Sequence, residues 1–221
     1  MSKNKLYTLG EEISNSITHG IGSLLSIAAL VLMIVVSAIH HNAMAIVTST
    51  LFGVSLIILY TMSTLYHAIS NEKAKKVLKI FDHSTIYLLI AGSYTPFTLV
   101  ALKSINETKA WIVFGIVWAI AILGTITYSI FKNKFKILNV ISYILMGWII
   151  VIALPEIVSF FKINNAMNGL YLLVAGGIFY TVGVIFYALQ KKNLKYFHTI
   201  WHVFVLLGSI CHFFSVLLYV I

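Results

Sequence analysis

Residues 167–189 read MNGLYLLVAGGIFYTVGVIFYAL, a stretch of the chain without a single charged side chain. An α-helix rises about 1.5 Å per residue, so this stretch is long enough to cross a hydrocarbon core of about 30 Å. Similar apolar stretches occur at residues 17–39, 44–69, 82–102, 110–131, 137–155 and 198–220. The sequence therefore predicts an all-α fold, a bundle of seven transmembrane helices that forms a single domain over residues 1–221.

The composition agrees with a membrane protein. Of the 221 residues, 60% are hydrophobic and only 10% are charged, and the mean hydropathy is +0.99. These values exclude an ordinary soluble globular domain. The polar start of the chain and the first apolar stretch carry no small-residue cleavage pattern, so we expect a retained helix and no removed signal peptide. Cys211 is the single cysteine, so the sequence predicts no intrachain disulfide.

The net charge of +9 comes from lysines in the short connections between the apolar stretches. Lysines in such connections are topology signals, so we expect no nucleic-acid partner. Alternate connections divide the lysines twelve against three. The larger set is Lys3, Lys5, Lys73, Lys75, Lys76, Lys79, Lys132, Lys134, Lys136, Lys191, Lys192 and Lys195, and the smaller set is Lys103, Lys109 and Lys162. Because positive loops stay inside, the N-terminus is predicted in the cytoplasm and the C-terminus outside, in a multi-pass protein of a bacterial inner or plasma membrane.

Two prolines and several glycines carry predictions about the helices. Pro96 lies within the third span, where it removes a backbone hydrogen bond and should kink the helix. Pro155 is interpreted as the end of the fifth span. Small residues allow close helix packing in membranes, and this role is predicted for Gly22, Gly176, Gly177 and Gly183.

Polar residues gather at one predicted depth, in the cytoplasmic half of the membrane. Span two ends there with Ser63-Thr-Leu-Tyr-His67, and span three begins there with Asp82-His83. Span seven begins there with His198-Thr-Ile-Trp-His202, and span one enters through Glu12-Ile-Ser-Asn-Ser-Ile-Thr-His19. Ionisable groups inside the hydrocarbon are costly and usually functional, so this convergence is the main functional signal of the sequence.

The histidines of this cluster predict a metal site. His198 and His202 stand one turn apart, and with His67 they form a set that suits zinc and leaves the fourth tetrahedral position for water. Three neutral ligands lower the pKa of such a water towards ~7. Asp82 is the candidate proton acceptor, and Ser63 could hydrogen-bond the same water or a substrate oxygen. The alternative is that the paired imidazoles only bond backbone carbonyls or lie at the headgroup level.

Other polar residues receive structural interpretations. We expect His19 to hydrogen-bond across helices, His83 to point away from Asp82, and His212, about 21 Å beyond His198 along the helix, to be an interhelical hydrogen-bonder. Glu12, Asn15 and Thr18 form a polar stripe at the start of span one. For Asn15 the preferred explanation is that it caps the N-terminus of this helix.

Taken in order, these motifs resemble the hemolysin III branch of the progestin and adiponectin receptor (PAQR) family, and the resemblance covers all seven spans. A bacterial member is indicated, since the chain is short and lacks a long N-terminal region. The resemblance implies a zinc ion near the cytoplasmic side, held by His67, His198 and His202, with Asp82 holding a water and Ser63 as the span-two serine. It also implies amide hydrolysis of lipids, as in alkaline ceramidases, and a role in membrane homeostasis.

Three functions therefore stay open. The first is a zinc-dependent hydrolase that acts on a membrane lipid as substrate. The second is a non-enzymatic sensor of membrane fluidity, or a receptor-like protein with a lipid ligand, in which zinc is structural. The third is a pore-forming or channel-forming cytolysin. A pore would need a continuous polar path, and the outer halves of the spans contain few ionisable residues that could line one.

Overall fold

The computed structural model describes residues 7–190 and 194–221, without the side chains of Asn133 and Lys136. Within these residues the chain is helical, and the structure contains no strand there. The helices are α1 (Leu9–Ile39), α2 (Ala43–Ala68), α3 (Glu72–Pro96), η1 (Phe97–Leu102), α4 (Lys103–Ile105), α5 (Glu107–Phe131), η2 (Lys132–Phe135), α6 (Lys136–Gly147), η3 (Ile149–Ala153), α7 (Leu154–Ile163), α8 (Met167–Leu189) and α9 (Phe197–Tyr219).

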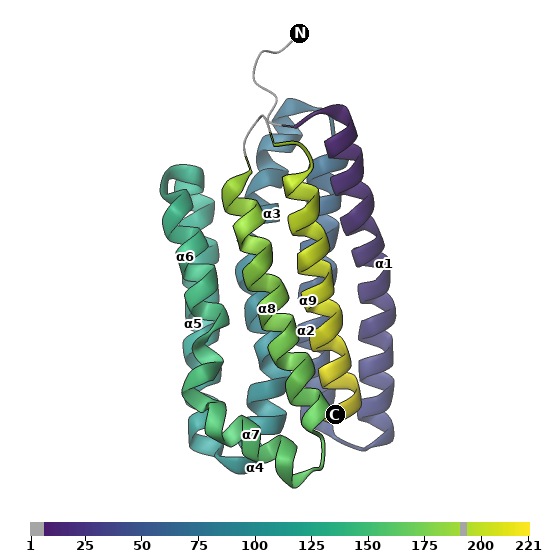
Figure 1. Cartoon of the computed structure of the whole chain (residues 1–221), viewed down its shortest axis with the longest axis vertical. Helices are drawn as coiled ribbons and strands as arrows, with labels where there is room; N and C mark the ends of the chain where they lie inside the picture. The colour runs from purple at the N-terminus through teal and green to yellow at the C-terminus, as the bar shows by residue number, and fades with distance from the viewer. Residues whose placement is uncertain (1–6, 191–193) are drawn as a thin grey trace.

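Seven helical segments of the described chain are long and apolar enough to cross a membrane, which confirms the predicted fold class. Figure 1 shows them as one elongated bundle, with α1 at one edge, α5 and α6 at the other, and α8 and α9 across the front. The end of the bundle at which α1 begins is called the α1-start end below. Four of the lysines used to predict orientation, Lys3, Lys5, Lys191 and Lys192, lie outside the described residues.

Two spans begin earlier than predicted. The first begins at Leu9 and not at residue 17, because Thr8 caps α1 and forms a capping box with Glu11. The third begins at Glu72 and not at residue 82, because the side chain of Asn71 accepts hydrogen bonds from two backbone N–H groups of the first turn of α3. Hydropathy locates the apolar part of a helix, whereas caps decide where its hydrogen bonds start.

The fifth span was also predicted too short. It runs from Ile137 to Ile163 and consists of α6, η3 and α7. Pro155 does not end it but lies in the first turn of α7, where a missing backbone N–H costs no hydrogen bond. At Pro96 the α-helix gives way to the π-helix Phe97–Leu102. The regular α-helix therefore ends at the residue where the sequence predicted a kink.

Helix α3 is the central helix of the bundle. With its π-helical continuation it has 78% of its most apolar window buried, against 17–50% for the other six spans. Its buried hydroxyl side chains bond the carbonyls of the preceding turn, as Thr95 does to Ala91 (2.8 Å) and Thr98 to Tyr94 (3.0 Å). Because these hydroxyl groups are hydrogen-bonded, this polar helix can lie in the interior of the bundle. Asp82 on α3 is therefore inside the protein.

Close helix contacts confirm most of the predicted glycine roles. A Cβ atom at Gly176 would lie 2.2 Å from the ring of His212, and one at Gly22 would lie 2.8 Å from the ring of Tyr60. Gly183 is similarly close to Phe204. Gly177 is the exception, because no atom lies within 4 Å of its Cβ position. Its neighbour Gly176 faces α9, whereas Gly177 borders a cavity.

Candidate metal centre

Two helix ends meet at the α1-start end and bring the histidines together. His67 lies in the last turn of α2, and His198 and His202 lie one turn apart at the start of α9. The residue before α9, Tyr196, has a left-handed backbone (φ 63°), and its N–H donates to Glu11 Oε1 (2.8 Å). This hydrogen bond holds the start of α9 against the start of α1.

The three histidine side chains converge in the interior. Their exposed fractions are 3% for His67, 3% for His198 and 0% for His202. One ring nitrogen from each lies within 4.8 Å of the others, which makes this group able to hold a metal ion. The Nε2 atoms of His198 and His202 are 3.1 Å apart, and Nε2 of His67 is buried without a hydrogen-bond partner among the described residues.

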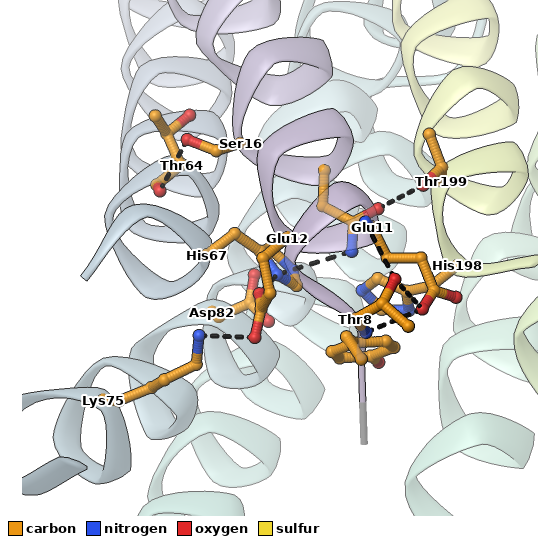
Figure 2. Close-up of polar contacts among 12 residues, drawn as sticks. Thr8, Glu11, Glu12, Ser16, Thr64, His67, Lys75, Asp82, His198 and Thr199 are labelled. Carbon is orange, nitrogen blue, oxygen red and sulfur yellow. Dashed lines mark hydrogen bonds and ion pairs between the residues drawn. The ribbon is translucent and has the colours of Figure 1, made fainter. Parts of the chain in front are cut away.

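The other ring nitrogen of each histidine has a fixed partner. His67 Nδ1 donates to Glu12 Oε2 (2.6 Å), and Figure 2 shows this contact. His198 Nδ1 donates to Gln190 Oε1 (3.0 Å), and His202 Nδ1 to the backbone carbonyl of Asn15 (3.3 Å). A proton on each Nδ1 leaves a lone pair on each Nε2. A neutral histidine binds a metal ion through such a lone pair.

The spacing of two of these nitrogens matches that of ligands on a tetrahedral metal ion. Ligand nitrogens at about 2.0 Å from zinc lie about 3.3 Å from each other, close to the 3.1 Å found between His198 and His202. Without a cation, the lone pairs of two buried nitrogens would face each other. Acceptors on the Nδ1 side are also the partners that metal-binding histidines usually have. Three neutral imidazoles form a donor set that zinc accepts, as do copper, iron and nickel.

The structure places Asp82 and Ser63 next to this cluster. Both are buried, with exposed fractions of 5% and 1%. The Asp82 carboxylate lies 3.2 Å from His83 Nδ1, and the hydroxyl of Ser63 is buried without a hydrogen-bond partner among the described residues. Ser63 is one turn before His67 on α2, so the two side chains share a helix face.

The prediction for His83 is wrong. Its Nδ1 lies 3.2 Å from Asp82 Oδ2 and 3.0 Å from the carbonyl of Lys79. The ring is held there by Tyr128, which stacks on it with ring centres 5.5 Å apart. Neighbouring side chains of a helix diverge by about 100°. The Asp82 carboxylate nevertheless reaches the His83 ring, because that ring is turned back toward the carbonyl of Lys79, one turn earlier.

Two further predictions for this region are also wrong. The ring of His19 stacks on that of His202 with centres 3.5 Å apart, and neither of its nitrogens has a hydrogen-bond partner among the described residues. Asn15 does not cap α1. Its Oδ1 accepts a hydrogen bond from Thr199 (2.5 Å) and ties α1 to α9. The prediction for His212 is confirmed, because its Nε2 donates to the carbonyl of Leu173 on α8 (3.2 Å).

Sequence reasoning missed the partners Glu12, Gln190 and Tyr7. Gln190 accepts from both His198 and the Tyr7 hydroxyl (3.0 Å), and the Tyr7 ring lies 4.9 Å from that of His198. Burial raises the pKa of Tyr7 well above its usual value, so the hydroxyl stays a donor at neutral pH. The available signal was spacing, since Gln190 is the polar residue that directly follows a span and precedes His198 by eight residues.

A cavity of about 120 Å³ adjoins the cluster. It lies between α3, α6, α8 and α9, and its walls are mostly apolar, as at Leu89, Ile144 and Val184. His19 and Asp82 also line it, as does Trp201, whose ring centre is 4.9 Å from that of His198. The cavity also reaches Trp148, which is exposed on the outer surface of the bundle. An apolar space therefore connects the neighbourhood of the histidines to the lipid-facing side.

Fold and site together define a polytopic helical membrane protein with a buried three-histidine metal-site candidate. A family model described as "Haemolysin-III related" matches residues 7–213, and the chain belongs to this family of membrane proteins. It is accordingly a multi-pass protein of the cell membrane.

Individual relatives confirm the resemblance derived from the motifs. The chain is 46% identical over 211 residues to "Hemolysin-3" of Bacillus cereus, covering 96% of this chain and 92% of the relative. It is 46% identical over 214 residues to "Hemolysin-3 homolog" of Bacillus subtilis (strain 168), covering 97% and 96%. A more distant relative is the human "Monocyte to macrophage differentiation factor", 27% identical over 215 residues and covering 95% and 84%.

The metal centre makes a direct prediction. A His198→Ala/His202→Ala variant should lose bound zinc, from near one ion per chain to below about one tenth, because a single imidazole remains of the set. Elemental analysis of the protein purified in detergent measures this. His40→Ala is the control, since His40 is exposed outside the cluster. Equal zinc in the double variant and the control would contradict the assigned ligands.

Proposed function

We propose that this protein is a zinc-dependent hydrolase that cleaves an acyl-amide bond of a membrane lipid and serves membrane homeostasis. The observation that carries the proposal is the position of the histidine cluster. Three imidazole nitrogens that could hold one ion lie beside a buried aspartate, and an apolar cavity leads from there to the lipid-facing surface. A site for a hydrolytic ion and a site for an acyl chain are thus adjacent.

We further propose that the α1-start end faces the cytoplasm. The division of lysines between alternate connections, twelve against three, supports this orientation through the positive-inside rule. The lipid amide would then be cleaved in the cytoplasmic half of the membrane, near the level of the headgroups. A lipid could reach the site without leaving the bilayer.

Each residue of the site has a defined part in this reaction. His67, His198 and His202 would hold the zinc ion, which would supply Lewis acidity for activating a water at neutral pH. Asp82 accepts the proton of the attacking water and returns it to the leaving amine. Ser63 would hydrogen-bond a substrate oxygen, and its buried hydroxyl, which has no hydrogen-bond partner among the described residues, supports this role. The apolar walls hold the acyl chain and exclude bulk water from the reaction.

A structural role for the metal is the second candidate. The cluster joins α1, α2 and α9, because Glu12 and Asn15 on α1 accept hydrogen bonds from histidines of the other two helices. An ion there would stabilise the bundle of a lipid sensor without any turnover. The two functions differ in their response to changes at Asp82, which is not among the ligands.

An Asp82→Asn variant should keep its zinc and lose turnover. Proton transfer by a positioned group contributes about 10²–10⁴-fold in rate, so hydrolysis of a long-chain N-acyl amide with a fluorescent amine should fall by about that factor. Glu156→Gln is the matched control, because Glu156 pairs with Lys109 away from the cluster. If wild type turns over no amide, or if Asp82→Asn is as fast as wild type, the hydrolase proposal fails and the structural role remains.

A Gly177→Leu variant should discriminate between substrates by chain length. Its Cβ position has free space and borders the cavity, so a leucine occupies the volume predicted for the acyl chain. The KM for a sixteen-carbon amide should rise about tenfold, whereas that for a four-carbon amide should stay near the wild-type value. Gly115→Leu, on the exposed side of α5, is the control. An equal effect on both substrates would show that the cavity does not bind the chain.

A further inference from the structure

A second hollow lies at the α1-start end and shares no lining residue with the apolar cavity. It is a groove of about 730 Å³ between the first turns of α1, the end of α2 and the first turns of α3. Its lining is polar as well as apolar, and it includes Glu12, His67, Lys75 and Lys76. Among the three histidines of the cluster, His67 is the one that lines this groove. The groove is therefore the side from which a metal ion in water could approach the site.

Three side chains stand in a row from the groove to the cluster. Lys75 Nζ lies 2.6 Å from Glu12 Oε1, and Glu12 Oε2 lies 2.6 Å from His67 Nδ1 (Figure 2). The side chains are 25%, 19% and 0% exposed in that order, so Glu12 and Lys75 cover His67. Lys75 is also held over the ring of Tyr66, 5.1 Å from its centre, and that ring lies 4.6 Å from the ring of His67.

The charges of Glu12 and Lys75 determine how this pair affects a cation in the groove. With both oxygens of Glu12 engaged, the carboxylate fixes the orientation of His67 and offers no free oxygen to the groove. The ammonium group of Lys75 in front of it repels another cation. If Lys75 moves away, the same carboxylate becomes the first anionic ligand that a cation in the groove would meet, directly next to His67.

We propose that Glu12 is the positioning residue of His67 and that its ion pair with Lys75 closes the route by which the metal ion passes between the groove and the three-histidine site. The ion pair determines how fast the metal ion exchanges, and it does not determine the affinity of the site for the ion. This inference rests on the metal site of the proposed function, and it is independent of whether that site hydrolyses a lipid.

The test is the rate at which zinc leaves the full-length protein. Zinc-loaded protein in detergent is mixed with an excess of a chromogenic chelator, and the first-order release is followed by absorbance. Lys75→Met should start with near one zinc per chain, as wild type does, and release it about tenfold faster. Glu12→Gln keeps an acceptor for His67 Nδ1 but loses the ion pair, so it should also release zinc faster.

Three controls separate the pair from a general loosening of the protein. Lys75→Arg keeps the pair and should release zinc at the wild-type rate. Lys76→Met, an exposed neighbour that lines the same groove, should do the same. The double variant Glu12→Gln/Lys75→Met should be no faster than the faster single variant, because both remove one interaction.

The proposal is overturned if Lys75→Met releases zinc at the wild-type rate, or if Lys76→Met accelerates release as much. Absence of zinc from wild type would overturn it together with the metal centre. Fast release from Lys75→Met in a protein that cleaves no amide would support this inference while refuting the hydrolase.

Discussion

The structure depends on how three imidazole rings are accommodated inside a membrane bundle. Each ring is buried and donates its Nδ1 proton to a separate acceptor, namely Glu12, Gln190 or the carbonyl of Asn15. The protons are thereby directed away from the centre of the cluster, and the Nε2 lone pairs are left there. Buried lone pairs that face each other cost free energy unless a cation joins them. The pattern of hydrogen bonds around the histidines is thus itself an argument for a metal ion.

Several features of the fold follow from this requirement. Helix α1 must begin early enough to supply Glu12 and Asn15, and its capping box at Thr8 and Glu11 provides that start. Glu11 and Asn15 also bond to Tyr196 and Thr199, which fixes the start of α9. The hydroxyl-rich helix α3 lies at the centre and brings Asp82 to the edge of both the cluster and the apolar cavity. Two hollows of different character then border this region, an apolar one that reaches His19 and Asp82 and one lined partly by lysines that reaches His67.

Much of this was predictable from the sequence, and the failures have two physical causes. Apolar runs of about twenty residues predicted the seven spans, and the spacing of His67, His198 and His202 predicted the cluster. Hydropathy excluded the polar first turns of α1, so the role of Glu12 was missed and Asn15 was interpreted as a cap. Contacts such as that of His83 with Asp82, or the stacking of His19 on His202, depend on side-chain rotamers and on the positions of neighbouring helices. A periodicity argument assigns a residue to a helix face but does not supply these.

The central claim, that the three histidines bind one zinc ion through their Nε2 atoms, is tested most directly by X-ray absorption at the zinc edge on the purified protein. We predict a four-coordinate ion with three imidazole ligands at about 2.0 Å and one further oxygen ligand. The multiple scattering of imidazole rings distinguishes these ligands from water or carboxylate oxygen. A six-coordinate oxygen environment, or a signal with fewer than three imidazoles, would contradict the account.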